Sequence, residues 1–217
     1  MNKKSILCFD FDGTLANSAS LEFHSMLKTV QDFGHEEIQG NDLLSYYGPT
    51  EPGIIEKIVG EDEFPAALPY FFRTYSELQE TLLTPNQQII NMLLQLKKHQ
   101  GVRLVLVTGR SLETLEISLH YLGMEDIFEK VYTGSKDGIN KQDSMDQVAE
   151  DFDVNKEDMV YIGDTVEDVN VMRENGYDII SAAYFHDIEY QDHLEKLNPQ
   201  LTMRSIDALN NIISEII

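Results

Sequence analysis

The most constraining feature of this sequence is an apolar run near its start that ends in two carboxylates. Residues 6–9 are Ile, Leu, Cys and Phe, and Asp10 and Asp12 follow them before Gly13. A continuous apolar run that is bounded by a turn residue indicates a buried strand of a parallel sheet. Because an unpaired buried carboxylate costs several kcal/mol, two of them at the end of such a strand favour a bound cation.

The position of this pair also predicts where a ligand would bind. In open α/β sheets the ligand site lies beyond the carboxyl ends of the strands, which is where Asp10 and Asp12 are expected. The two-residue period of a strand puts both carboxylates on one side and turns Phe11 into the packing. Gly13 permits a tight turn and the approach of backbone N–H groups to an anion. A buried strand followed by an ordinary Asp-Gly turn would give the same pattern, so the pair alone does not decide.

The rest of the chain divides into two kinds of pattern. Between residues 17 and 84 the apolar residues recur at helical spacing, and no strand is indicated. Beyond residue 84, helical segments alternate with apolar strands, which are expected at 102–107, 127–132, 159–162 and 179–184. This alternation predicts an α/β fold with a doubly wound parallel sheet. We expect a core domain of residues 1–16 and 85–217 and an inserted all-helical domain of residues 17–84, the alternative being one domain with more helices.

Charge and cysteine content limit the possible partners and the compartment. The formal net charge of −22 argues against nucleic acid and against anionic membranes, both of which are bound through Lys and Arg. An anionic substrate would therefore need a local cation and a few basic side chains. Cys8 is the only cysteine, which excludes an intrachain disulfide, and its place in the strand predicts a small buried apolar group. With no apparent signal peptide or membrane span, a cytoplasmic protein is expected.

Polar side chains also follow two later strands of the predicted sheet. Thr108 and Gly109 come directly after the strand at 102–107, and Asp164 follows the strand at 159–162. Asp168 is four residues beyond Asp164, so the two share one face if a helix begins near residue 165. Lys141 lies just before a predicted helix. The chain therefore offers several charged or polar groups for one edge of the sheet.

Together and in this order, these motifs resemble those of the haloacid dehalogenase superfamily of phosphohydrolases, in the branch with a helical cap inserted after the first motif. The resemblance covers essentially the whole chain and implies a Rossmann-like core. Tyr46, Tyr47, Gly48 and Pro49 resemble a cap loop of phosphoglycolate phosphatase-like members. The resemblance implies a magnesium-dependent phosphatase that hydrolyses a small phosphomonoester, such as phosphoglycolate, through an aspartyl-phosphate intermediate.

The resemblance also implies a role for each motif residue. Asp10 would be the nucleophile, and Asp12 would be the acid and base in proton transfer. The carboxylate of Asp12 separates this chain from the dehalogenases that it resembles, which lack one there. Thr108 and Gly109 would bind the phosphoryl oxygens.

The remaining motif residues would supply the cations. Lys141 would neutralise the charge of the nucleophile and the phosphate, with Lys136 as the alternative. Magnesium would be held by Asp10, Asp164 and the backbone carbonyl of Asp12. Asp168 would bind the metal directly or through water.

Several alternatives remain open at this point. The same motifs serve phosphomutases of the β-phosphoglucomutase kind, and an inorganic pyrophosphatase or a non-catalytic protein that binds a phosphate ligand is also conceivable. Arg73 is the residue of the helical segment that we most suspect of contacting an anionic leaving group, but an ordinary arginine on a helix surface is the favoured interpretation. His24 and His186 are expected to be ordinary polar residues, and the protein is expected to be a monomer or a weak homodimer.

Overall fold

The computed structural model describes residues 2–135, 138 and 140–217 of the chain. Its core is one six-stranded sheet in the order β3-β2-β1-β4-β5-β6. All five neighbouring pairs are parallel. The predicted doubly wound parallel α/β fold is therefore confirmed. The strands are β1 (Ile6–Phe9), β2 (Arg103–Val107), β3 (Lys130–Tyr132), β4 (Met159–Gly163), β5 (Asp178–Ala182) and β6 (Thr202–Met203).

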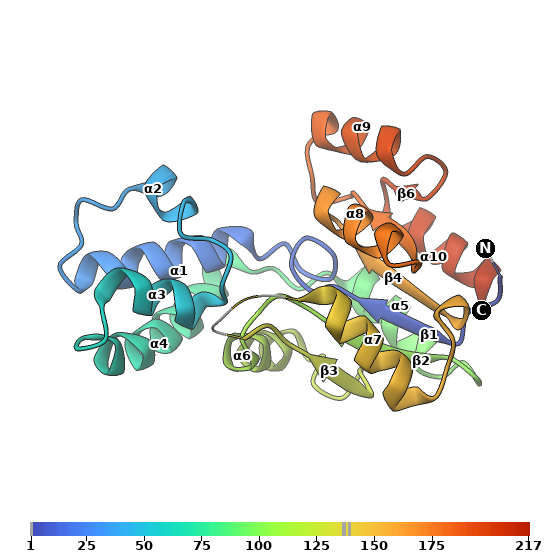
Figure 1. Ribbon diagram of the computed structural model, residues 1–217, viewed down its shortest axis with the longest axis horizontal. Helices are drawn as coiled ribbons and strands as arrows, with labels where there is room; N and C mark the ends of the chain where they lie inside the picture. The colour runs from blue at the N-terminus through green and yellow to red at the C-terminus, as the bar shows by residue number, and fades with distance from the viewer. Residues whose placement is uncertain (1, 136–137, 139) are drawn as a thin grey trace.

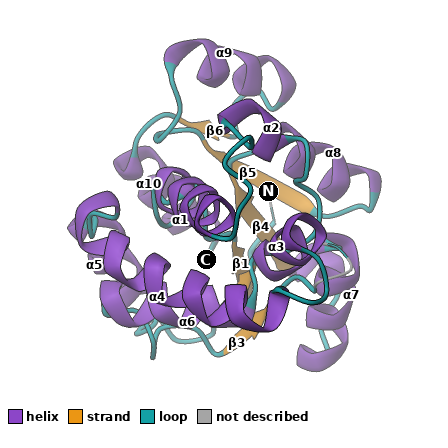
Figure 2. Ribbon diagram, turned by 90° about the vertical axis from the view of Figure 1, so that its left-hand side faces the viewer, coloured by secondary structure: helices purple, strands orange, loops and turns teal. Residues whose placement is uncertain are grey.

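Helices cover both faces of the sheet, which Figure 2 shows between two helical layers. One face packs against α5 (Gln87–Leu96), α6 (Leu112–Leu122) and α10 (Ile206–Ile216). The other face packs against α7 (Lys141–Phe152), α8 (Val166–Glu174) and α9 (Ile188–Leu197). Because both faces are covered, every side chain of β1 is fully buried, which explains its unbroken apolar sequence. Cys8 is one of these buried side chains, as predicted, and burial raises the pKa of its thiol.

The strand order places the end of β1 at the switch point of the sheet. From β1 the chain builds outward on one side through β2 and β3, and on the other side through β4, β5 and β6. Asp10 continues the pairing beyond β1, since its backbone N–H donates to the carbonyl of Ile162 at 2.8 Å. In doubly wound sheets the crevice for a ligand opens at this point.

Four helices between β1 and β2 extend from the carboxyl end of the sheet (Figure 1). They are α1 (Ala19–Asp32), α2 (Gly40–Leu44), α3 (Glu51–Val59) and α4 (Phe64–Leu82). All residues from 17 to 84 are described, and none of them lies in a strand. The long helices α1 and α4 pack on each other through buried apolar side chains such as Met26 and Phe71. We call residues 17–84 the helical unit, and its standing as a separate domain remains a prediction.

The structure differs from the sequence-based prediction at three elements. The strand expected over residues 127–132 begins only at Lys130, because Ile127 closes a turn on the carbonyl of Met124. Helix α9 and strand β6 were not predicted. Leu194 is the only buried side chain of α9, and β6 has two residues, so neither carries a clear periodic pattern. None of the described helices is long and apolar enough to cross a membrane.

Candidate active site

A cavity of about 730 Å³ opens at the carboxyl ends of β1 and β4. The core contributes to its lining from the turn after β1, the loop after β2 and the starts of α7 and α8, and the helical unit contributes from α1 and from the segment before α3. Six of the seven site residues expected from the sequence line this cavity: Asp10, Asp12, Gly109, Lys141, Asp164 and Asp168. The fold therefore brings together residues that are up to 158 positions apart in the chain.

Three carboxylates meet Lys141 at the base of this cavity. Asp10, Asp164 and Asp168 are all buried, and each offers one oxygen within 4.8 Å of the others. Lys141, the first residue of α7, places its Nζ 2.5 Å from Oδ2 of Asp10 and 2.7 Å from Oδ1 of Asp168. The alternative, Lys136, lies outside the described residues. Lys141 therefore lies beside the predicted nucleophile, and its role as the motif lysine remains a prediction.

The carboxylate of Asp164 is held by contacts with the turn after β1 and with the loop after β5. One oxygen accepts a hydrogen bond from Oγ1 of Thr14 at 3.2 Å, and the other lies 2.6 Å from Nε2 of His186. Gly13 has a φ of 70°, and a Cβ built there would lie 2.0 Å from the Asp164 carboxylate. Only glycine leaves room for this carboxylate next to the turn. The Asp-Gly turn is therefore part of the site rather than an ordinary turn.

Asp168 has two roles in the geometry of the site. It is the third residue of α8, where its Oδ2 accepts from the backbone N–H of Thr165 at 3.0 Å and Thr165 caps Asp168 in return. This reciprocal capping fixes the start of the helix. Its other oxygen is the one that binds Lys141. Glu167, next to it in the sequence, is exposed and is not part of the carboxylate cluster.

The charge of the carboxylate cluster is not balanced by Lys141 alone. Burial, together with the nearby charges of Asp168 and Asp164, raises the pKa of Asp10 from 3.8 to about 7 despite the contact with Lys141. Burial and the charge of Asp168 also raise the pKa of Asp164. Clustered carboxylate oxygens are the donors that a hard divalent cation such as Mg²⁺ prefers. The donor set and its excess negative charge thus both fit a divalent cation.

We expect the metal-free protein to lose stability as the pH rises from 5 to 9. The pKa of Asp10 is about 7 in the folded state, and that of Glu22 rises from 4.5 to about 8. The folded protein therefore binds more protons than the unfolded chain over this range, and the free energy of unfolding falls by up to roughly 7 kcal/mol, because the two shifts together span about 5 pH units at about 1.4 kcal/mol each. Urea unfolding in chelator at several pH values measures this slope. It should be smaller in Asp10→Asn, and a free energy that rises with pH would contradict the expectation.

Asp12 is held away from the carboxylate cluster by a buried arginine. Nε of Arg110 donates to both oxygens of Asp12, at 3.0 and 2.8 Å, and the hydroxyl of Ser18 donates to the same carboxylate. The Arg110 side chain is 2% exposed, whereas that of Asp12 is 29% exposed and lines the cavity. The carboxylate of Asp12 is thus accessible from the cavity, and its orientation is set by two fixed donors.

Arg110 also joins the core to the helical unit. Its Nη1 donates to the hydroxyl of Tyr75 in α4 at 2.5 Å and to the hydroxyl of Ser118 in α6 at 3.1 Å. The guanidinium carbon lies 5.1 Å from the ring centroid of Phe11 and 5.2 Å from that of Tyr75. Arg110 therefore connects the carboxylate of Asp12 to both α4 and α6.

The helical unit contributes two glutamates near Asp12. Glu51, the first residue of α3, is buried and accepts from the backbone N–H of Ser111 at 2.9 Å and from the hydroxyl of Thr114 at 2.6 Å. Glu22 lies on α1 and lines the cavity, as does Tyr47, whose hydroxyl interacts with it. Burial and the charges of Asp12 and Glu51 raise the pKa of Glu22 to about 8.

Of the two phosphate-binding residues predicted after β2, only one lines the cavity. Gly109 lines the cavity, whereas Thr108 is buried at the end of the strand and is not among the lining residues. The hydroxyl of Thr108 accepts from the backbone N–H of Arg110 at 3.4 Å. A phosphate-binding role for Thr108 and Gly109 remains a prediction.

Sequence reasoning missed four residues of the site: Arg110, Glu22, Glu51 and His186. Arg110 directly follows the Thr-Gly pair, and this adjacency was the available signal. His186 was expected to be an ordinary polar residue, but it contacts Asp164 from the loop after β5. Arg73 has the surface position that was the favoured interpretation, because it is exposed on α4, packs against Tyr70 and does not line the cavity.

Comparison with known proteins gives a consistent set of similarities. A model of the family described as haloacid dehalogenase-like hydrolase matches residues 7–182. The chain is 25% identical to a phosphoglycolate phosphatase of Psychrobacter arcticus, covering 95% of this chain and 94% of that protein. It is 22% identical to pyrophosphatase PpaX of Bacillus cereus, covering 98% of each. A crystal structure of a predicted phosphoglycolate phosphatase from Haemophilus somnus has the same fold, with a TM-score of 0.76, 18% identity, and coverage of 98% of this chain and 99% of that one.

Proposed function

Because the chain belongs to the haloacid dehalogenase-like hydrolase family, we propose that it is a magnesium-dependent phosphatase that hydrolyses a small phosphomonoester through an aspartyl-phosphate. The observation that carries this proposal is the arrangement around Asp10. A buried carboxylate stands beside Lys141 in a cavity, and the more exposed carboxylate of Asp12 lines the same cavity. One carboxylate is thus placed for attack on phosphorus and the other for proton transfer.

In the first step an oxygen of Asp10 attacks phosphorus and forms the aspartyl-phosphate. The bond between phosphorus and the alcohol oxygen breaks, and Asp12 donates a proton to that oxygen. Lys141, already 2.5 Å from Asp10, offsets the negative charge that accumulates as the phosphoryl group approaches. The backbone N–H of Gly109, which lines the cavity, would bind a phosphoryl oxygen near the start of α6.

In the second step water attacks the phosphorus of the aspartyl-phosphate. Asp12, now ionised, accepts a proton from this water, and the carboxylate of Asp10 leaves with the release of inorganic phosphate. Arg110 and Ser18 hold Asp12 in one orientation through both steps. The same side chain therefore acts as acid and then as base, and the enzyme returns to its starting state.

We propose that Asp10, Asp164 and the backbone carbonyl of Asp12 bind Mg²⁺, with Asp168 bound directly or through water. The excess negative charge of the buried carboxylate cluster supports this assignment. When bound, the metal would reduce the repulsion between the nucleophile and the anionic phosphate. Such a site would also let a chain of net charge −22 attract a phosphate ester.

We further propose that the helical unit acts as the cap of this phosphatase. Tyr47, Thr50 and Glu51 line the cavity from this unit, together with Glu22. Groups in these positions would contact the alcohol half of the substrate and exclude water from the reacting phosphorus.

Phosphate release from a panel of small esters and pyrophosphate, with Mg²⁺ and with chelator, tests the proposal. We expect turnover to fall about a hundredfold when chelator removes Mg²⁺, because the buried carboxylates would then repel the phosphate. Turnover should return when Mg²⁺ is added back. Turnover that is equal in chelator would overturn the metal assignment. Formation of a phosphate isomer without release of inorganic phosphate would instead indicate a mutase, and binding without turnover would indicate a non-catalytic protein.

A further inference from the structure

The part of the cavity that the helical unit lines is acidic. It includes Glu22 and Glu51, together with the uncharged side chains of Tyr47 and Thr50, and we call these four residues the acidic wall. Asp12, which would protonate the leaving oxygen, lies near enough to raise the pKa of Glu22. The alcohol half of a substrate would therefore extend from Asp12 toward this wall.

The basic groups of the cavity are already paired with carboxylates. Among the described residues that line it, the basic side chains are Arg110, Lys141 and His186. Arg110 is bound to Asp12, and its Nη2, which has no hydrogen-bond partner, is buried and not open to the cavity. Lys141 is bound to Asp10 and Asp168, and His186 lies 2.6 Å from Asp164. All three come from the core rather than from the helical unit. An anionic leaving group would consequently meet the acidic wall without a free cation.

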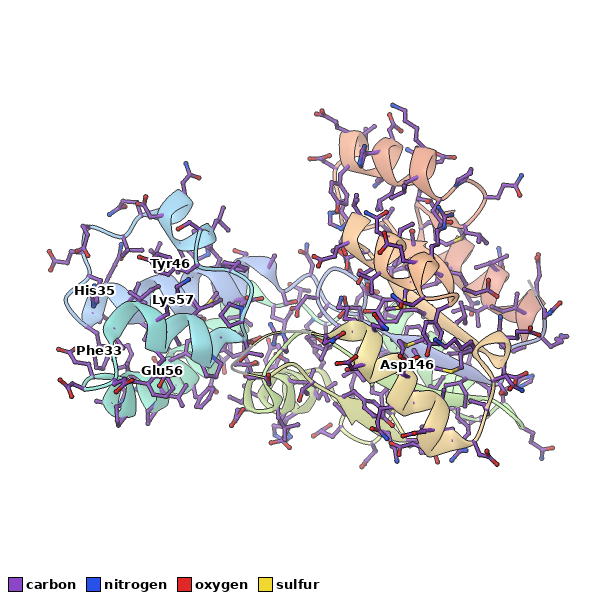
Figure 3. The ribbon with its side chains drawn as sticks, in the orientation of Figure 1. Phe33, His35, Tyr46, Glu56, Lys57 and Asp146 are labelled. Carbon is purple, nitrogen blue, oxygen red and sulfur yellow. The ribbon has the colours of Figure 1, made fainter. Side chains whose placement is uncertain are left out.

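The Lys and Arg residues of the helical unit lie elsewhere. Lys28 binds Asp32 at 2.6 Å. Figure 3 labels Lys57 beside Tyr46, and its Nζ lies 5.3 Å from the centroid of that ring. Arg73 stacks on Tyr70 in a similar way. None of these three residues lines the cavity, so the charge of the wall is not offset from within the helical unit.

We propose that the preferred substrate is the phosphate monoester of an amino alcohol, whose ammonium group binds at the acidic wall. This inference rests on the proposed phosphatase function and specifies its substrate class. Both oxygens of Glu51 accept hydrogen bonds at the start of α6, whereas Glu22 interacts with the hydroxyl of Tyr47, so Glu22 keeps the greater capacity to bind the ammonium group. A bound cation favours the ionised form of Glu22 and is attracted by the other carboxylates.

The same electrostatics disfavour the two substrates suggested by the names of relatives. The leaving group of phosphoglycolate carries a carboxylate, and the leaving group of pyrophosphate is itself a phosphate. Each would place a negative charge beside Glu51 in a partly buried cavity, where repulsion is less screened than in water, and would also oppose the ionisation of Glu22. The sequence similarity to those relatives is low, at 25% and 22%, and leaves room for such a difference in specificity.

Three esters with leaving groups of the same length but different charge test the inference. They are 2-aminoethyl phosphate, 2-hydroxyethyl phosphate and phosphoglycolate, assayed for kcat/KM with Mg²⁺ at pH 7.5. We expect 2-aminoethyl phosphate to have the highest kcat/KM and to exceed phosphoglycolate at least tenfold. In Glu22→Gln this ratio should shrink at least fivefold, because the carboxylate that selects the cation is gone. Glu77→Gln removes an exposed charge from α4 and should leave the ratio as it is.

The outcomes separate this inference from the proposed function. If p-nitrophenyl phosphate is hydrolysed but 2-aminoethyl phosphate does not exceed both other esters in kcat/KM, the amino alcohol assignment is overturned and the phosphatase function stands. If no ester, including p-nitrophenyl phosphate, releases phosphate, the proposed function fails and the substrate class fails with it. An unchanged charge preference in a folded Glu22→Gln protein would also overturn the role of the acidic wall.

Discussion

Asp10→Asn is expected to reduce phosphate release by at least about 10⁴-fold, the range seen when a catalytic nucleophile is removed. An amide is a poor nucleophile, so no aspartyl-phosphate forms, although the side chain keeps its size. The fold should survive, because the substitution removes one charge from a buried cluster that already has an excess of carboxylates. In chelator we therefore expect the free energy of unfolding to stay equal or to rise.

Steady-state release of phosphate and urea unfolding of the same preparation measure the two effects. Asp207→Asn, an exposed change of the same chemistry in the first turn of α10, is the matched control and should keep its activity within about threefold. Turnover by Asp10→Asn within tenfold of the original protein would remove Asp10 from the role of nucleophile. A folded, inactive variant beside an active control would support it.

The sheet could be predicted because its signal is local. Strands β1 and β4 are buried on both faces, so their apolar runs are unbroken and end at polar residues that mark the edge of the sheet. The parallel fold then requires Asp10 and Asp164 to lie at neighbouring strand ends, and the structure has them there. The order of the elements and their apolar periodicity were thus enough to predict the fold and the proximity of these two carboxylates.

The contacts across the cavity could not be predicted in the same way. Arg110 and Asp12 are 98 positions apart, and Glu51 and Ser111 are 60 apart, so no periodic pattern links them. His186 depends on the path of the loop after β5, which carries no motif. Only the pair of Glu51 and Ser111 depends on how the helical unit packs against the start of α6, and all of these contacts are properties of the whole fold. The chemical roles of the site residues remain predictions until variants are measured.

The structure also changes how the acidic net charge should be understood. With a net charge of −22, an anionic substrate must be attracted by a few positive groups within the site itself. The base of the cavity offers such a group in Lys141. The wall formed by Glu22 and Glu51 adds two further carboxyl groups and no basic side chain. Under the two proposals, one end of the cavity would bind the phosphoryl group with its metal, and the other end would bind a cation.

Arg110→Ala is expected to destabilise the protein by roughly 3–5 kcal/mol, the range for breaking a buried ion pair by removing one partner. Arg110 is 2% exposed and donates to Asp12, Tyr75 and Ser118, so its loss removes one donor from each of several partly or fully buried oxygens. A cavity of the size of the guanidinium adds to this cost. Arg110→Lys keeps the charge but not the fork of donors, and it should recover only part of the loss.

Urea unfolding in the presence of Mg²⁺ measures these changes, and Arg103→Ala provides the matched control. Arg103 also binds a carboxylate, that of Glu129, but both side chains are more than 40% exposed. Exposed ion pairs contribute about 1 kcal/mol or less, so this variant should remain close to the original stability. Because Arg110 orients Asp12 as well, Arg110→Lys should lower kcat more than it raises KM, whereas a purely structural role predicts normal kcat in whatever fraction remains folded. A loss of stability below 1 kcal/mol in Arg110→Ala would mean that other contacts hold Asp12 and Tyr75. It would contradict the conclusion that Arg110 connects Asp12 to α4.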